Sequence, residues 1–145
     1  MMLGPFYIEV FMSLMKVEYQ GNYRTGAVHL DSGNTIITDA PKDNNGNGEA
    51  FSPTDLLSTS LASCMLTIAA MKARSLGVEF QGVQVEIQKK MAASPRKVSE
   101  VVLKFDWNGL DQKLEPQVLD QLKEAALNCP VALSLDPSVK KTMIW

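Results

Sequence analysis

The sequence has little of the chemistry that metal centres require, because it contains one histidine, His29, and only two cysteines, Cys64 and Cys129. Zinc in proteins usually takes four Cys, His or carboxylate ligands at close spacing, so we expect no metal site, and no cofactor is expected either. Two cysteines are also too few for a disulfide-stapled scaffold. They remain sufficient for redox chemistry. His29 is predicted to be a surface or half-buried strand residue rather than a general base.

An excess of basic charge is also absent. The 145 residues include 14 Lys and Arg against 16 Asp and Glu, for a net charge of -2, and neither half of the chain is strongly basic. Nucleic-acid binding usually needs a basic surface, so it is excluded as the expected function. Hydrophobic residues make up 46% and charged residues 21%, which is typical of a globular domain rather than of a disordered or fibrous chain.

The amino terminus lacks the features of a secretory signal. Residues 1–15 are apolar, but they have no basic region, carry Glu9 within the apolar run and lack a small-residue cleavage site. We therefore expect a cytoplasmic protein. Residues 1–15 are interpreted as an N-terminal extension, which is either a strand or a segment preceding a downstream start, and residues 16–145 as a single domain.

The first part of the domain has the period of two that is typical of strands. Residues 16–20 and 24–30 alternate polar and apolar side chains around a Gly-Asn turn, which predicts a hairpin, and the β-branched residues 35–38 predict a third antiparallel strand. Residues 40–50 are polar and rich in Asn and Gly. They predict a long loop, and loops of this length are functional or mobile.

A long helix is predicted over residues 53–76. Ser52 supplies a capping hydroxyl, Pro53 suits the first helical position, Asp55 lies in the first turn and Gly77 supplies a stop. The helix is apolar nearly all round between residues 61 and 71, so it should run through the core. Polar residues at both ends leave an apolar run too short for a membrane span, and no membrane association is expected.

The remaining chain returns to strands and then to helices. Alternation over residues 83–88 and 101–107, with a Ser-Pro turn between them, predicts a second hairpin. Pro116 opens an amphipathic helix, and Pro130 begins a short further helix before a final strand at residues 141–145. This order of elements predicts an α+β domain.

The two cysteines have different local settings. Cys64 lies in the middle of the long helix, where the simplest interpretation is a small, buried and inert side chain. Cys129 precedes Pro130 at a helix start, where backbone N–H groups stabilise a thiolate. Arg24 opens a strand at the edge of an apolar surface or at a solvated strand end. Sixty-five positions separate the two cysteines, so only the fold could bring their sulfurs together.

Three segments resemble the OsmC/Ohr family of osmotically inducible and organic hydroperoxide resistance proteins. They are GNYRTGAVHLDSG around Arg24, SPTDLLSTSLASCM ending at Met65 just after Cys64, and ALNCPVAL around Cys129. The likeness covers residues 16–145, and the mid-helix Cys paired with a later Cys-Pro-Val is its most specific part. The resemblance implies an intertwined α+β homodimer in which antiparallel sheets wrap around two long central helices, with active sites at the subunit interface.

The same resemblance implies a thiol-dependent, peroxiredoxin-type peroxidase that reduces organic hydroperoxides in oxidative-stress defence. Cys64 would be the peroxidatic cysteine and Cys129 the resolving one. Arg24 would stabilise the attacking thiolate, because a guanidinium stays charged and lowers the pKa of a nearby thiol. An external dithiol would complete the cycle. The alternative is an OsmC-like stress protein that binds a small hydrophobic ligand and has little peroxidase activity, and a third interpretation is a domain with two inert thiols.

One position departs from the family pattern. Active family members resemble one another in placing a glutamate directly after the helix-opening proline, where it pairs with the arginine, and here that position is Thr54. Asp55 is next along the chain, but one helical step turns it by about 100°. Glu49 in the preceding loop is a second possible partner for Arg24.

Overall fold

The computed structural model describes residues 14–145, so the predicted N-terminal extension lies almost entirely outside the described residues. The described part of the chain forms two compact units, residues 14–53 and 54–145. Each unit is described by itself below.

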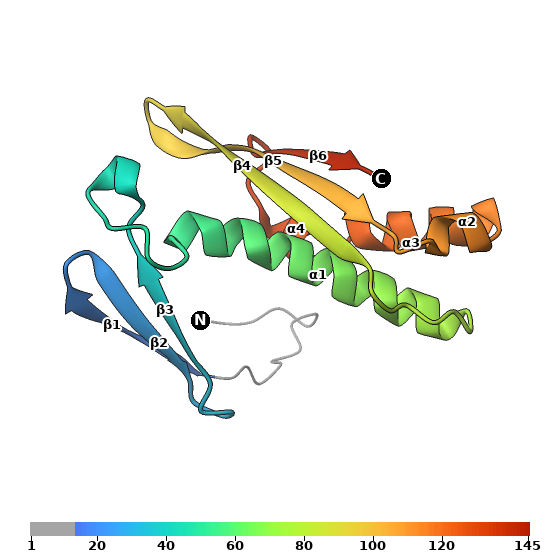
Figure 1. Cartoon of the computed structure of the whole chain (residues 1–145), viewed down its shortest axis with the longest axis horizontal. Coiled ribbons are helices and arrows are strands. Elements are labelled where there is room, and N and C mark those ends of the chain that lie inside the picture. The colour runs from blue at the N-terminus through green and yellow to red at the C-terminus, as the bar shows by residue number, and fades with distance from the viewer. Residues whose placement is uncertain (1–13) are drawn as a thin grey trace, which may run out of the picture. The chain divides into compact units, whose positions relative to one another are not determined.

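The first unit is an antiparallel meander of three strands, as the sequence predicts. Strands β1 (Met15–Gly21), β2 (Arg24–His29) and β3 (Thr35–Asp39) pair in the order β1-β2-β3 (Figure 1). The long loop that follows contains one 3-10 turn, η1 (Lys42–Asn44), and leads to the first helix. The tight β1–β2 turn includes two residues with positive φ, Asn22 at 54° and Tyr23 at 60°.

This sheet has no apolar interior within the described residues 14–53. Its buried side chains are Thr38, Asp39 and Ser52, all of them polar. One face collects side chains that are at least half exposed, namely those of Met15, Val17, Tyr19 and Ile36. A small sheet needs an apolar face buried against something to be stable, so this face must be covered from outside the sheet.

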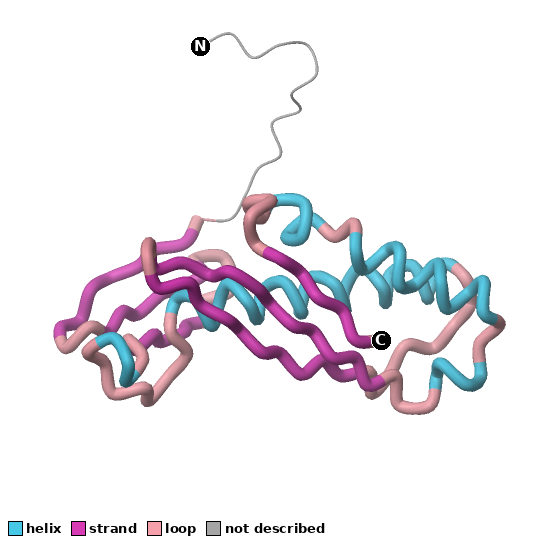
Figure 2. The backbone as a smooth tube through the Cα atoms, turned by 90° about the horizontal axis from the view of Figure 1, so that it is seen from above, coloured by secondary structure: helices cyan, strands magenta, loops and turns pink. Residues whose placement is uncertain are grey.

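The second unit places a three-stranded sheet over one long helix (Figures 1 and 2). Its elements are α1 (Pro53–Ser75), β4 (Gln84–Ala93), β5 (Arg96–Asp106), α2 (Leu110–Lys113), α3 (Pro116–Leu127), α4 (Pro130–Ser134) and β6 (Lys140–Ile144). Helix α1 begins at the predicted proline and ends just before Gly77, whose φ of 71° favours glycine. The predicted α+β class is confirmed, and only the short helix α2 was not expected.

The second sheet corrects the expectation of antiparallel sheets. Strands β4 and β5 form the predicted antiparallel hairpin, but β6 pairs parallel to β5, from Glu100↔Lys140 to Lys104↔Ile144. A parallel pair needs a crossover connection, and helices α2, α3 and α4 supply it between β5 and β6. The three helices carry the chain back to the other end of the sheet, so β6 runs in the same direction as β5.

One apolar core fills the second unit. A stripe of α1 that turns toward the sheet is fully buried, and it meets inward side chains of β5 and the buried residues of α3 and α4. The shared members are Leu61, Met65, Ala69, Ala73, Val101, Leu103, Phe105, Leu122, Ala126, Cys129 and Ala132. The alanines on α1 leave room for the sheet to approach its backbone closely.

Helix α1 is long and apolar enough to cross a membrane when judged by length and composition alone, with a mean hydropathy of 1.4 over its most apolar window. The sequence-based argument that its apolar run is too short was therefore wrong. A third of that window is buried inside the structure. A helix that passes through a protein core has the same composition, so this one helix is weak evidence for a membrane span.

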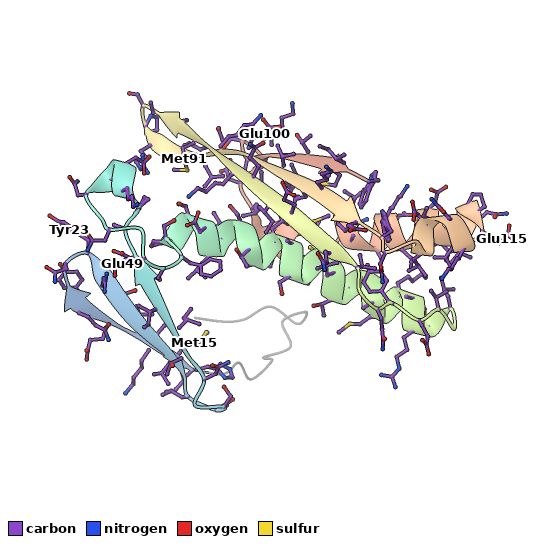
Figure 3. The ribbon with its side chains drawn as sticks, viewed as in Figure 1. Met15, Tyr23, Glu49, Met91, Glu100 and Glu115 are labelled. Atoms are coloured by element: carbon purple, nitrogen blue, oxygen red, sulfur yellow. The ribbon has the colours of Figure 1, made fainter. Side chains whose placement is uncertain are left out.

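A charged ladder joins the three strands of the second sheet. Glu100 on β5 lies opposite Lys90 on β4 and Lys140 on β6, accepts from the Thr142 hydroxyl at 2.5 Å and lies 3.2 Å from Lys90 Nζ (Figure 3). The Thr142 hydrogen bond and the nearby lysines hold the pKa of Glu100 below its ordinary value of 4.5. A carboxyl with a lowered pKa stabilises the fold above its unfolded pKa.

Replacement of Glu100 by Gln is predicted to lower stability at neutral pH and to have a shrinking effect as the pH falls below about 4.5. Urea unfolding of both proteins between pH 7 and pH 3.5 measures this difference. Glu124→Gln, which removes an exposed carboxylate on α3, should lack that pH dependence. A constant stability difference over the whole pH range would contradict the prediction.

Candidate active site

Cys64 lies halfway along α1, next to the buried stripe rather than within it. Its side chain is partly exposed, while Leu61 and Met65 on either side of it in the chain are buried. It packs against the core cluster from its edge. The prediction of a wholly buried thiol does not hold for Cys64, because one side of its helix faces away from the core.

Cys129 is placed by the junction between two helices. Helix α3 ends at Leu127, Pro130 begins α4, and Cys129 is the N-cap residue, with its Sγ accepting from the Ala132 backbone N–H at 3.4 Å. Its side chain is completely buried in the core cluster. The predicted helix start is confirmed, and with it the position of this cysteine at the cap.

The fold brings the two thiols together. Both cysteines are free, and Cys64 lies near enough to Cys129 to be one of the causes that raise the pKa of the Cys129 thiol. Burial raises the pKa of the Cys129 thiol, the Ala132 N–H opposes that rise, and Cys64 adds to it. The local expectation of a stabilised thiolate at Cys129 is therefore wrong, because desolvation outweighs the helix-start N–H groups.

Arg24 is the first residue of β2 and lies between two carboxylates. Its Nη2 is 2.5 Å from Glu49 Oε2 and 3.5 Å from Asp39 Oδ2, and these partners raise its pKa (Figure 3 labels Glu49). The guanidinium Nε is buried and has no hydrogen-bond partner among residues 14–145. Arg24 thus has one edge fixed by anions and one N–H donor unused. Arg24 belongs to the first unit and both thiols to the second, so its pairing with Cys64 stays a prediction.

The two carboxylates considered as substitutes for the missing glutamate have different partners. Glu49 binds Arg24, whereas Asp55 Oδ1 accepts from Lys89 Nζ at 2.8 Å. The same Lys89 amine donates to the Thr54 hydroxyl at 2.8 Å. Of these two carboxylates, Glu49 is therefore the one that pairs with Arg24.

A scan of protein-family models matches residues 46–143 to the family described as OsmC-like protein. The chain belongs to the OsmC-like family. The predicted family is confirmed, and the match includes both thiols and Glu49 at the end of the loop before α1. Within residues 14–145, no group of three or more His, Cys, Asp or Glu side chains could hold a metal ion.

Individual proteins extend the comparison. The chain is 30% identical to an uncharacterised Bacillus subtilis (strain 168) protein, YmaD, over 87% of this chain and 93% of that protein. A crystal structure from Psychrobacter arcticus 273-4, named as a candidate osmotic stress induced and detoxification response protein, is 50% identical with a TM-score of 0.85, covering 96% of this chain and 98% of its own.

More distant structures share the OsmC-like fold. An organic hydroperoxide resistance protein OsmC from Legionella pneumophila is 18% identical with a TM-score of 0.73, covering 94% and 98% of the two chains. The organic hydroperoxide resistance protein OhrB of Bacillus subtilis is 15% identical with a TM-score of 0.60, covering 92% and 97%. These likenesses confirm the OsmC-like fold.

Sequence reasoning missed two residues of this OsmC-like site. Lys89 continues the inward alternation of Val85 and Ile87 on β4, so the period of two could have placed it facing α1. Asp39 ends β3 with no flanking pattern, and its burial beside Arg24 follows only from the pairing of β2 with β3. The alternation along β4 could have indicated Lys89 from the sequence, whereas no sequence pattern indicated Asp39.

Removal of the Cys64 side chain is predicted to lower the pKa of Cys129, because Cys64 is one of the causes that raise it. The rate of Cys129 alkylation by iodoacetamide, followed by peptide mass spectrometry from pH 6 to pH 11, should show a lower midpoint in Cys64→Ala than in the wild type. Cys129 remains buried in both proteins, so the pH midpoint of its alkylation should stay above that of an exposed thiol.

Ser63→Ala is the matched control, since Ser63 neighbours Cys64 but is exposed on α1. It should leave the Cys129 midpoint unchanged. Identical midpoints in Cys64→Ala and the wild type would show that the two thiols do not interact.

Proposed function

We propose that this OsmC-like protein is a thiol-dependent peroxidase that reduces organic hydroperoxides, with Cys64 as the peroxidatic and Cys129 as the resolving thiol. The observation that carries the proposal is the pair of free, interacting cysteines, one partly exposed and one buried, on two elements 65 positions apart. A single buried cysteine would be unremarkable in a core. Two thiols that lie near each other can pass from thiol to disulfide without leaving the site.

The first step oxidises Cys64. Its thiolate attacks the terminal oxygen of R–O–OH, an S–O bond forms as the O–O bond breaks, and the departing alkoxide takes up a proton to give the alcohol. Cys64 becomes a sulfenic acid and the hydroperoxide is reduced by two electrons. An attacking thiolate and a departing alkoxide are both anions, so a fixed cation at the site favours this step.

The later steps restore the thiols. The Cys129 thiol attacks the Cys64 sulfur, an S–S bond forms and water leaves. An external dithiol then exchanges with this disulfide, which returns both cysteines to thiols while the dithiol becomes its own disulfide. Free cysteines are kept reduced in the cytoplasm, which is where we place this cycle.

We assign the cation to Arg24. Glu49 and Asp39 hold one of its terminal nitrogens, and its buried Nε–H has no partner within residues 14–145, so this donor is available to a thiolate or an alkoxide oxygen. Arginine stays charged at any relevant pH, which a general acid such as histidine would not. The two carboxylates orient the guanidinium but do not bind its Nε–H group.

The apolar exposed face of the first sheet supports a homodimer. Val17, Tyr19 and Ile36 are between 50% and 69% exposed on that face. Among the described residues of this unit, no apolar side chain is buried. A second copy of the chain would supply the missing cover, and the organic hydroperoxide substrate would bind at the apolar interface so formed.

The wild type is predicted to consume cumene hydroperoxide when supplied with dithiothreitol. Cys64→Ser should lower the rate to the uncatalysed level, because it removes the nucleophile. Arg24→Gln should lower the second-order rate constant about 100-fold, since it removes a donor aimed at developing charge. Rates are measured from the loss of peroxide over time.

One equivalent of hydroperoxide should also lower the intact mass by two hydrogens and join Cys64 to Cys129 in a tryptic map. Cys129→Ser should instead accumulate oxidised Cys64. Ser63→Ala serves as the control with both thiols intact. Equal peroxide consumption by the wild type and Cys64→Ser would overturn the proposal, and persistent free thiols without turnover would favour the ligand-binding alternative.

Sedimentation velocity is predicted to show a species of twice the chain mass. Val17→Lys should weaken that dimer about tenfold or more, because it buries an unpaired charge in an apolar interface. Glu18→Lys is the matched control, since Glu18 lies next to Val17 on the opposite face of β1. A monomer at micromolar concentration in the wild type would contradict the prediction.

A further inference from the structure

Asp39 is a buried carboxylate at the end of β3. Its side chain is 0% exposed, and its register partner across the β2–β3 pair is Arg24. One oxygen, Oδ2, accepts from the Glu49 backbone N–H at 2.9 Å and lies 3.5 Å from Arg24 Nη2. A single buried atom therefore contacts both the loop that carries Glu49 and the guanidinium that Glu49 binds.

Burial of this carboxylate costs stability unless charge and hydrogen bonds compensate. Arg24 supplies the charge and the Glu49 N–H supplies a hydrogen bond. The second oxygen, Oδ1, is buried without a hydrogen-bond partner within the part of the chain that the structure describes. A buried polar atom that lacks a hydrogen bond lowers stability, so its presence at a site is typical of a functional constraint.

Glu49 could not keep its position by its own ion pair. Its side chain is 62% exposed, and an exposed ion pair contributes little against the freedom of a long side chain. Its place is fixed through the backbone, by the bond from its N–H to Asp39 and by the Asp39 N–H donating to Phe51 O at 3.1 Å.

The rest of the loop is held against the same strand end. Gly48 N–H donates to Ala40 O at 3.2 Å, and Gly46 lies so close to the Ala40 backbone that no Cβ would fit. The loop residues before Glu49 are therefore anchored one position beyond Asp39. Of all these anchors, Asp39 alone also approaches the guanidinium.

We propose that Asp39 is a positioning residue that holds Glu49 and Arg24 against each other, and so fixes the direction of the free Arg24 N–H. The effect of this role on catalysis rests on the proposed peroxidase function, whereas the contacts of Asp39 with Glu49 and Arg24 do not. Asp39 does not touch the reacting atoms in this role. It acts through Glu49, which binds the guanidinium directly.

The geometry is tested by NMR of the intact protein without any peroxide. In Asp39→Ala, the Glu49 amide should exchange with solvent about tenfold faster, and the Arg24 Nε–H resonance should shift. Asp39→Asn keeps an acceptor for the Glu49 N–H and removes the charge, so it should keep the amide protected while the Arg24 resonance still shifts. Asp111→Ala, which removes an exposed carboxylate on α2, should change neither signal.

The consequence is tested by a ratio of rates. Reaction of Cys64 with cumene hydroperoxide needs an oriented cation for the alkoxide, whereas alkylation of Cys64 by uncharged iodoacetamide needs only the thiolate. The ratio of the two rate constants should fall about tenfold in Asp39→Ala and stay unchanged in Asp111→Ala. In a Glu49→Ala background, Asp39→Ala should add far less than tenfold, because the residue it acts through is gone.

The outcomes separate the two proposals. A wild type without peroxide turnover would defeat the proposed function, and the NMR comparison would still decide the geometry. Unchanged Glu49 and Arg24 signals in Asp39→Ala would overturn the positioning role. Changed signals with an unchanged ratio, or fully additive effects of Asp39→Ala and Glu49→Ala, would also overturn it, since Asp39 would then be merely structural. If Asp39→Ala does not fold, Asp39→Asn provides the same comparison for Arg24.

Discussion

The packing of α1 against the second sheet is the constraint on which the thiol pair depends. The fully buried residues Leu61, Met65 and Ala69 recur every four positions, so one stripe of the helix is turned inward. Cys64 precedes Met65 and falls at the edge of that stripe. A helix rotated by a single residue would bury Cys64 or expose it fully, so the intermediate exposure of this thiol depends on that packing.

Charge is handled differently in the two units. In the second, Lys89 lies on the inward face of β4 and is bound by Thr54 and Asp55 at the start of α1. In the first, the Arg24 cation is bound by Glu49 and Asp39 at a strand end. The start of α1 thus binds an amine, whereas the loop before it supplies the carboxylate that binds the arginine.

The sequence predicted the elements whose signals are local. Helix α1, the two hairpins and the Cys129–Pro130 junction follow from period, caps and prolines, and all are present. The parallel placement of β6 could not be predicted, because it depends on how three helices cross the sheet. Long-range packing likewise accounts for the influence of Cys64 on the pKa of Cys129, for the burial that raises this pKa, and for the hydrogen bond between Asp39 and Glu49. The family resemblance pointed to the cysteines, but only the fold shows their unequal exposure.

That inequality gives a Cys64–Cys129 disulfide a preferred direction of opening. An incoming thiolate meets the sulfur of Cys64, since Cys129 has no exposed surface. Cys129 is then the leaving group, and a thiol whose pKa is raised by burial leaves slowly. In the proposed cycle, this disulfide would therefore open by attack at the sulfur of Cys64, on the partly exposed side of α1.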